Sequence, residues 1–228
     1  MKPIILGATL ACTLLACGHT VTAGDCTIGQ TLGTPRFQVD AVQCTSQYAF
    51  AFLVDPGAAT CCAAGYRPES ITFYLNFGPD DMTSRGVGVA VLAADPAGDG
   101  FVPGGELCAT PLVWSLFVDI PGLYTLTLPP YPSSFGDLVC PCLDSGEPYF
   151  LMARINGPIT PEHAADAVID DSPIGGRTFV SQDGGAWQDV VGDLGWPGEL
   201  VVHAEVACCG DPIPVQGSTW GSLKGLYR

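Results

Sequence analysis

Apolar and polar residues alternate along most of this chain, and the longer period of an amphipathic helix is almost absent. From Ile71 to Phe77 the odd positions are large and apolar, and from Leu123 to Leu128 an apolar face lies opposite threonines. A two-residue period is typical of strands that turn one face to a core and the other to water. The pattern predicts strands at Phe37–Cys44, Gln47–Val54, Ser70–Phe77, Gly86–Ala94, Leu112–Val118, Leu123–Leu128, Tyr149–Asn156, Arg177–Ser181, Ala186–Val190 and Leu200–Ala207.

Turn-forming residues separate these segments, as in Asp55-Pro56-Gly57 and Asp183-Gly184-Gly185. No segment between them has the pattern of a crossover helix. About ten such strands predict an all-β fold in which two antiparallel sheets form a β-sandwich, either jelly-roll or Greek-key. The main irregular insertion is Pro158–Gly176, which we expect to form a loop on the rim, with a short helix starting at Thr160.

The N-terminus has the features of an export signal. Lys2 supplies a positive charge, Ile4–Leu15 is an apolar run, and small residues follow up to Ala23. The predicted organisation is a signal peptide at 1–23, a β-sandwich domain at 24–209, a Pro-rich linker at 210–217 and a C-terminal tail at 218–228. This organisation predicts a secreted, extracellular or cell-surface protein.

A second interpretation of the N-terminus is lipidation. Leu14-Leu15-Ala16-Cys17 resembles the lipobox of bacterial lipoproteins, in which the cysteine is acylated after cleavage. Cys17 would then anchor an outer-membrane or periplasmic lipoprotein. Soluble export is preferred, because Leu15 is unusual at its position and no long polar tether follows.

Composition excludes several classes of protein. Apolar residues make up 47% of the chain, which argues against disorder, and the net charge is −15. Lysine and arginine are few and not clustered, so neither nucleic acid nor an anionic lipid surface is an expected partner. No second apolar stretch reaches the ~20 residues of a membrane-spanning helix, so the mature chain is expected to have no transmembrane span.

Cysteine content indicates an oxidising compartment, where thiols pair and stay paired. Because neighbouring cysteines rarely bridge each other, each member of a vicinal pair is expected to reach a different partner. The nine cysteines after residue 23 are an odd number, so at least one thiol is unpaired or paired between chains. Self-association is therefore an expectation to test. The disulfide candidates are Cys26, Cys44, Cys61, Cys62, Cys108, Cys140, Cys142, Cys208 and Cys209.

Catalytic chemistry has little support in the sequence, and no catalytic residue is predicted. The mature chain holds two histidines, of which His203 has the position of a half-exposed strand residue and His163 lies in a loop. No nucleophile elbow or zinc-binding helix motif is present. The chain is therefore predicted not to be an enzyme.

Two features suggest ligand binding. Asp95 and Asp99 lie four positions apart in a glycine-rich turn, and their carboxylates make them candidate ligands for Ca²⁺, although turn formation alone explains them. Trp196 and Trp187 are candidates for a sugar-stacking surface, with core packing as the alternative. Trp196 is the stronger candidate for exposure because Gly195-Trp196-Pro197-Gly198 is a turn.

The last third of the chain contains Ser181-Gln182-Asp183-Gly184-Gly185-Ala186-Trp187-Gln188-Asp189, followed by a strand ending in Ala204-Glu205-Val206. This pattern resembles the closing strands of accessory β-sandwich domains in secreted bacterial proteins, which often have the form S-x-D-G-x-x-W-x-D. Such domains are attached to peptidases and surface proteins as lectin-like or adhesive jelly-roll modules. The resemblance covers about 30 residues, implies a β-sandwich and transfers no catalytic residue.

The C-terminal tail resembles short tails of the form TWG-x-(L/V/I)-K-x-L-(Y/F)-R on exported bacterial proteins. It implies a handle for sorting or anchoring machinery, with docking back onto the domain as the alternative. The expected recognition residues are Trp220, Leu223, Lys224, Tyr227 and Arg228.

Taken together, these features favour an exported, non-enzymatic binding or structural module, either carbohydrate-binding or adhesive, whose partner is a carbohydrate or a surface protein. A second hypothesis is a subunit of an extracellular assembly, linked by the odd cysteine or by an exposed edge strand. A third is a glycoside hydrolase that uses paired carboxylates.

Overall fold

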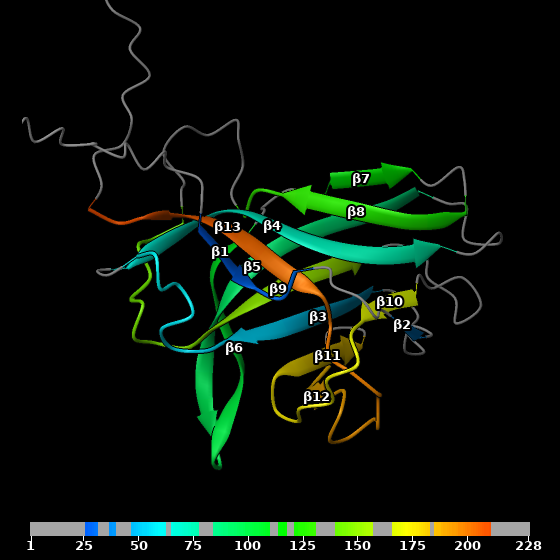
Figure 1. The fold of residues 1–228 in the computed structure, drawn as a ribbon. Coiled ribbons are helices and arrows are strands. Elements are labelled where there is room, and N and C mark those ends of the chain that lie inside the picture. Colours follow the sequence, from blue (N-terminus) through cyan, green and yellow to red (C-terminus); the bar gives the residue numbers. More distant parts are fainter. Residues whose placement is uncertain are drawn as a thin grey trace, which may run out of the picture.

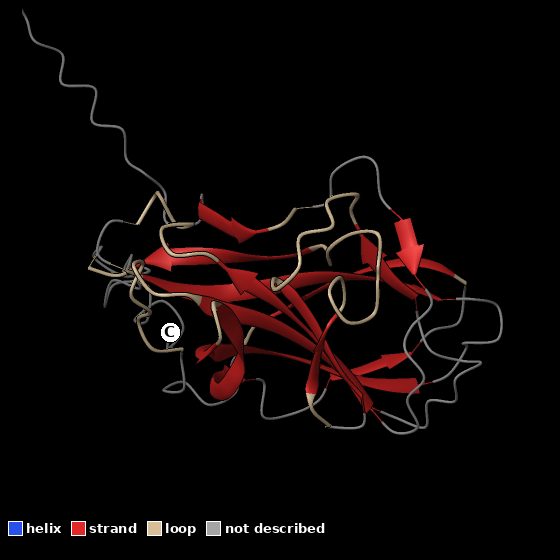
Figure 2. Cartoon of the chain, turned by 90° about the horizontal axis from the view of Figure 1, so that it is seen from below, coloured by secondary structure: helices blue, strands red, loops and turns tan. Residues whose placement is uncertain are grey.

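A computed structural model describes residues 26–31, 37–39, 47–62, 65–77, 84–109, 114–117, 121–130, 140–156, 166–182 and 185–210. The predicted signal peptide, Cys17, Cys44, the helix expected at Thr160, residues 211–217 of the predicted linker and the predicted tail lie outside these residues. The described part is built of strands and contains no helix (Figure 2). It therefore holds no helix with the length and hydropathy needed to cross a membrane.

The strands form two antiparallel sheets that pack face to face (Figure 1). In the six-stranded sheet the order is β1-β13-β4-β10-β2, and β8 also pairs with β4. Its strands are β1 (Cys26–Gly29), β2 (Phe37–Val39), β4 (Tyr66–Phe77), β8 (Gly122–Leu128), β10 (Asp166–Ile169) and β13 (Val202–Cys208). The predicted all-β, two-sheet architecture is confirmed.

In the seven-stranded sheet the order is β12-β11-β3-β9-β5-β6, and β7 also pairs with β5. Its strands are β3 (Gln47–Val54), β5 (Ser84–Ala97), β6 (Gly100–Ala109), β7 (Trp114–Phe117), β9 (Tyr149–Asn156), β11 (Thr178–Gln182) and β12 (Trp187–Asp189). The strands β5 and β6 form a long hairpin. This hairpin and the β11–β12 pair project from the molecule away from the six-stranded sheet (Figure 1).

Alternation along the strands explains the core between the sheets. Phe73 and Leu75 of β4 and Phe50 and Phe52 of β3 are all buried in one cluster. Burying one such side chain stabilises the fold by roughly 1.5–3 kcal/mol relative to leaving it exposed. The intervening residues of each strand point to the outer faces.

Strand predictions were most accurate for β3 and β9, which are nearly continuous apolar segments with both faces buried. The bounds of β3 and β9 agree with the prediction, whereas β1, β6 and β10 were not predicted. Pro158–Gly176 was expected to be a rim loop, and this is wrong for Asp166–Ile169, which pairs with both β4 and β2. A four-residue segment is too short to show a period, and its pairing depends on partners distant in sequence.

Four disulfides connect eight cysteines: Cys26–Cys61, Cys62–Cys208, Cys108–Cys140 and Cys142–Cys209. Each vicinal cysteine reaches a different partner, which confirms the expectation from backbone geometry. The turn after β3 is thereby joined to both β1 and β13.

Candidate binding groove on the seven-stranded sheet

The outer face of the seven-stranded sheet is lined by rows of side chains that come from neighbouring strands. One row runs from Trp187 of β12 through Ser181 of β11 and Ala49 of β3 to Arg154 of β9. Because alternate residues of paired strands share a face, the register alone places these four side chains on one surface.

A second buried cluster lies on this outer face, separate from the sandwich core. It consists of Ala51, Leu53, Ala90, Leu92, Phe150, Met152 and Phe179. The rings of Phe150 and Phe179 meet edge to face, with centroids 5.5 Å apart. Phe101 and Val102 of the β5–β6 hairpin pack against this cluster from one side, and Trp187 packs against it as well. The hairpin and β12 therefore both contact a well-packed apolar cluster on the outer face of the sheet.

A groove of about 250 Å³ crosses this face. Its lining residues are contributed by six strands and one turn: Tyr48, Ala49, Leu92, Gly104, Glu106, Met152, Arg154, Ser181, Gly185 and Trp187. The volume lies just below the ~300–1,000 Å³ typical of small-molecule pockets. It suits a small ligand, or a short segment of a longer one.

Local hydrogen bonds hold the Trp187 side of the groove in place. The Ser181 hydroxyl donates to the Gly185 carbonyl (2.7 Å), which closes the turn leading to β12. The Gln182 amide donates to the Gln188 side-chain oxygen (3.3 Å), which links β11 to β12. The Trp187 ring packs against the outer cluster and lines the groove, and its indole N–H is a potential donor.

The opposite side of the groove carries charge. Arg154 of β9 donates to the Glu106 carboxylate of β6, with an N–O distance of 3.3 Å. Both side chains are partly exposed, at 27% for Arg154 and 47% for Glu106. On the neighbouring rim, a Cβ added to Gly104 would fall 2.5 Å from the carboxyl carbon of Asp95, so Asp95 lies directly over this glycine. A side chain at position 104 would require the exposed Asp95 carboxylate to shift.

Neither Arg154 nor Glu106 was identified from the sequence. They lie 48 positions apart, and β6 contains Gly100, Pro103, Gly104 and Gly105, which indicate a turn rather than a strand. The available signal was Arg154 itself, a charged residue within the apolar segment Tyr149–Asn156.

The two candidate tryptophans have different environments. Trp187 is half-buried at the groove wall, whereas Trp196 is 9% exposed and belongs to the core cluster. The expected exposure of Trp196 is wrong, because its turn folds inward. The backbone N–H of Trp196 donates to the Val190 carbonyl (2.8 Å), and the ring centroids of Trp196 and Phe50 are 6.3 Å apart. A turn residue is buried when the turn itself packs on the core.

Asp95 and Asp99 lie at the end of the β5–β6 hairpin, and both are exposed. Gly98 beside them has φ +58°, as a tight turn requires. Among the described residues, the one group of at least three potential metal-ligating side chains is formed by cysteines and does not include these aspartates. Calcium binding at Asp95 and Asp99 stays a prediction.

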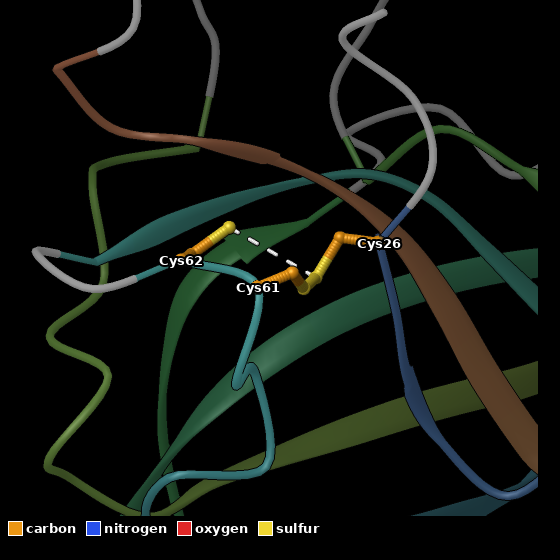
Figure 3. A group of neighbouring side chains, drawn as sticks. All are labelled: Cys26, Cys61 and Cys62. Carbon is orange, nitrogen blue, oxygen red and sulfur yellow. Dashed lines mark hydrogen bonds between the residues drawn. A yellow bond between two sulfur atoms is a disulfide. The ribbon is translucent and has the colours of Figure 1, made fainter. Parts of the chain in front are cut away.

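That cysteine group consists of Cys26, Cys61 and Cys62, whose sulfur atoms all lie within 4.8 Å of one another (Figure 3). The Cys62 and Cys26 sulfurs are 3.9 Å apart. All three are consumed in disulfides, so no thiolate remains for a metal ion. The group fastens strands rather than binding a ligand.

A buried ionic cluster lies at Glu199, which is 1% exposed. Arg177 contacts Glu199 (3.6 Å) and Asp55 (3.1 Å), and its guanidinium lies 5.1 Å from the ring centroid of Phe52. Burial raises the pKa of Glu199 to about 7; Arg177 opposes this shift, and the nearby carboxylates of Asp170, Asp55 and Asp189 add to it. Within the described residues, Glu199 Oε1 has no hydrogen-bond partner.

His203 faces the outer side of the six-stranded sheet, half-buried beside Tyr74. Burial lowers the pKa of His203, and the neighbouring Glu205 partly offsets this effect. The ring centroids of His203 and Tyr74 are 6.1 Å apart. His203 does not line the groove.

No protein-family model matches the chain, and no curated protein matches it. Among solved structures the chain is similar to the cysteine protease and lectin-like domains of Cwp84, a surface layer associated protein of Clostridium difficile, with 13% identity and a TM-score of 0.45 over 76% of this chain and 33% of that one. It is also similar to clostridial Cwp84 after propeptide cleavage, with 11% identity and a TM-score of 0.45 over 77% of this chain and 38% of that one. The chain thus spans well under half of these proteins, and no inference about function is based on them.

Proposed function

We propose that this protein is a non-catalytic binding module outside the cell that holds a carbohydrate in the groove of the seven-stranded sheet. The observation that carries the proposal is the groove itself, which joins a half-buried tryptophan to a partly exposed arginine–glutamate pair over an apolar floor.

These components match the chemistry of a sugar. A sugar ring has apolar C–H faces that can pack on an indole and on the apolar floor formed by Ala49 and Met152. Its hydroxyls both donate and accept, and the groove offers donors on Arg154 and Trp187 together with an acceptor on Glu106. The charged pair lies on two strands, β9 and β6, that both pair with β5, rather than on loops, so its geometry is preorganised.

The hydrolase hypothesis gains no observation from the groove. Glycoside hydrolysis requires two carboxyl groups on either side of the scissile bond. Of the described residues that line the groove, Glu106 alone carries a carboxylate, and it is paired with Arg154. Asp95 at the Gly104 rim belongs to the same β5–β6 hairpin as Glu106, so these two carboxylates do not lie on opposite sides of the groove.

Export and anchoring complete the proposal. Residues 1–23 would direct the chain out of the cytoplasm, and residues 218–228 would serve as a handle for sorting or anchoring machinery. The four disulfides support an oxidising location. Secretion or surface display therefore agrees with the covalent chemistry of the domain.

A glycan array followed by calorimetric titration of the bound saccharides tests the function. We expect Trp187→Ala to weaken binding by about 5-fold or more, because an interface tryptophan commonly contributes over about 1 kcal/mol. Tyr74→Ala, which removes an aromatic ring from the outer face of the opposite sheet, is the matched control and should leave affinity unchanged.

Product analysis on the same saccharides separates binding from turnover. Binding without cleavage supports the proposal, and release of shortened products would establish the hydrolase instead. If no saccharide on the array binds the folded, oxidised protein, the proposed function is wrong.

A further inference from the structure

We propose that the groove selects saccharides without negative charge and that Glu106 sets this selectivity by neutralising Arg154. The inference depends on the proposed carbohydrate-binding function. It adds the charge class of the ligand and a residue that determines specificity.

Charges around the groove support this selectivity. Among the described lining residues, Arg154 is the one cation, and its guanidinium is already paired with Glu106 at 3.3 Å. Asp95 adds a second carboxylate at the Gly104 rim. To bind an acidic sugar, Arg154 would have to break its ion pair with Glu106. Otherwise the negative charge of the sugar would lie beside two carboxylates, those of Glu106 and Asp95.

The whole molecule acts in the same direction. A net charge of −15 surrounds the groove with a field that repels anions, although salt screens most of this at distances beyond about 10 Å. Arg154 and Glu106 are only partly exposed, so their pairing is screened less than that of fully exposed charges. Glu106 is therefore the residue at the groove that determines the charge selectivity. The net charge adds a weaker repulsion of anions, to which all exposed carboxylates contribute.

Uncharged sugars avoid these costs. In the described structure Arg154 donates to Glu106 alone, which leaves other guanidinium donors for ligand hydroxyls. Glu106 retains acceptor capacity on its carboxylate for the same ligand. The ion pair then acts as an adjacent donor and acceptor, an arrangement that suits hydroxyl groups.

The experiment compares neutral oligosaccharides, namely oligomers of glucose, mannose and galactose, with the corresponding oligouronates. Affinities are measured by calorimetry at 20 and 150 mM salt for the wild type, Glu106→Gln and Glu69→Gln. Glu69 is an exposed carboxylate on β4 of the other sheet, so its variant makes the same change in net charge away from the groove.

We expect the wild type to bind a neutral oligomer about 10-fold or more tightly than its oligouronate, because charge-assisted contacts and their loss are of this order. Glu106→Gln should lower this ratio of neutral to uronate affinity by about 10-fold, to one or below, since it frees Arg154 to pair with a uronate carboxylate. Glu69→Gln should leave the ratio within about 2-fold.

Wild-type protein that binds oligouronates as tightly as neutral oligomers would overturn the selectivity while leaving the carbohydrate function intact. The same holds for a Glu106→Gln ratio equal to that of Glu69→Gln. Absence of binding to every saccharide would instead overturn the proposed function and this inference with it.

Discussion

At the scale of single residues, the buried carboxyl of Glu199 couples the fold to pH. Its pKa is raised above the ordinary 4.5 to about 7, mainly because burial disfavours the charged form. An acid with a raised pKa in the folded state stabilises the fold fully below the unfolded pKa, and this contribution is lost as pH rises through the folded pKa.

Glu199→Gln should therefore remove a pH dependence of stability between about pH 4.5 and 7. We expect the variant to match the wild type near pH 4.5 and to exceed it by roughly 1–3 kcal/mol at pH 8, where the wild type must hold a buried charge. Urea unfolding across this range measures the effect. Equal stability of the two proteins at pH 8 would contradict it, and Glu69→Gln provides the control.

Trp196 is a second residue whose environment decides its role. Because its ring is buried against Phe50, Trp196→Ala should destabilise the domain by roughly 3–5 kcal/mol. Saccharide affinity measured on the protein that remains folded should be unchanged. A specific loss of affinity with full stability would restore Trp196 as a ligand-binding residue.

At the scale of elements, the disulfides differ in the length of chain that they constrain. Cys62–Cys208 spans 146 positions and Cys108–Cys140 spans 32. Removing either bridge should cost roughly 2–5 kcal/mol, and the chain-entropy model makes the longer one more costly by about 1 kcal/mol. Urea unfolding under oxidising conditions of two variants, each with both cysteines of one bridge replaced by alanine, tests this ranking. A larger loss of unfolding free energy for the Cys108–Cys140 variant would contradict it.

The β5–β6 hairpin allows a test of the calcium prediction. Calcium held by Asp95 and Asp99 should raise the midpoint temperature of thermal unfolding as the calcium concentration increases. At 100 times the dissociation constant, the gain in the free energy of unfolding is about 2.7 kcal/mol. Asp95→Asn with Asp99→Asn should abolish the increase. An unchanged midpoint for the wild type in millimolar calcium would leave these aspartates as turn-forming and rim residues.

At the scale of the whole molecule, the distribution of cysteines bears on assembly. Eight cysteines of the predicted mature chain pair with one another, and Cys44 lies outside the described residues. For a binding module we expect a monomer band on a non-reducing gel, unchanged by Cys44→Ser. A ladder of multimers that Cys44→Ser removes would favour the extracellular-assembly hypothesis instead.

What the sequence determined by itself is the kind of fold. An apolar period of two specifies which face of a strand is buried whatever its partner, as in Ile71–Phe77 of β4. Continuous apolar runs bounded by turn residues predicted β3 and β9 with the correct bounds. Cysteine content and the geometry of vicinal residues likewise predicted bridges to separate partners. These are local properties, and they need no knowledge of neighbouring strands.

Tertiary structure alone decided which of these residues meet. Strand order brought Arg154 and Glu106 together across 48 positions, turned Asp166–Ile169 into a central strand, and folded the Trp196 turn onto the core. Each outcome depends on contacts between segments distant in sequence, about which local patterns carry no information. The groove could not be predicted for the same reason: the register of six strands, and not any single motif, assembles it.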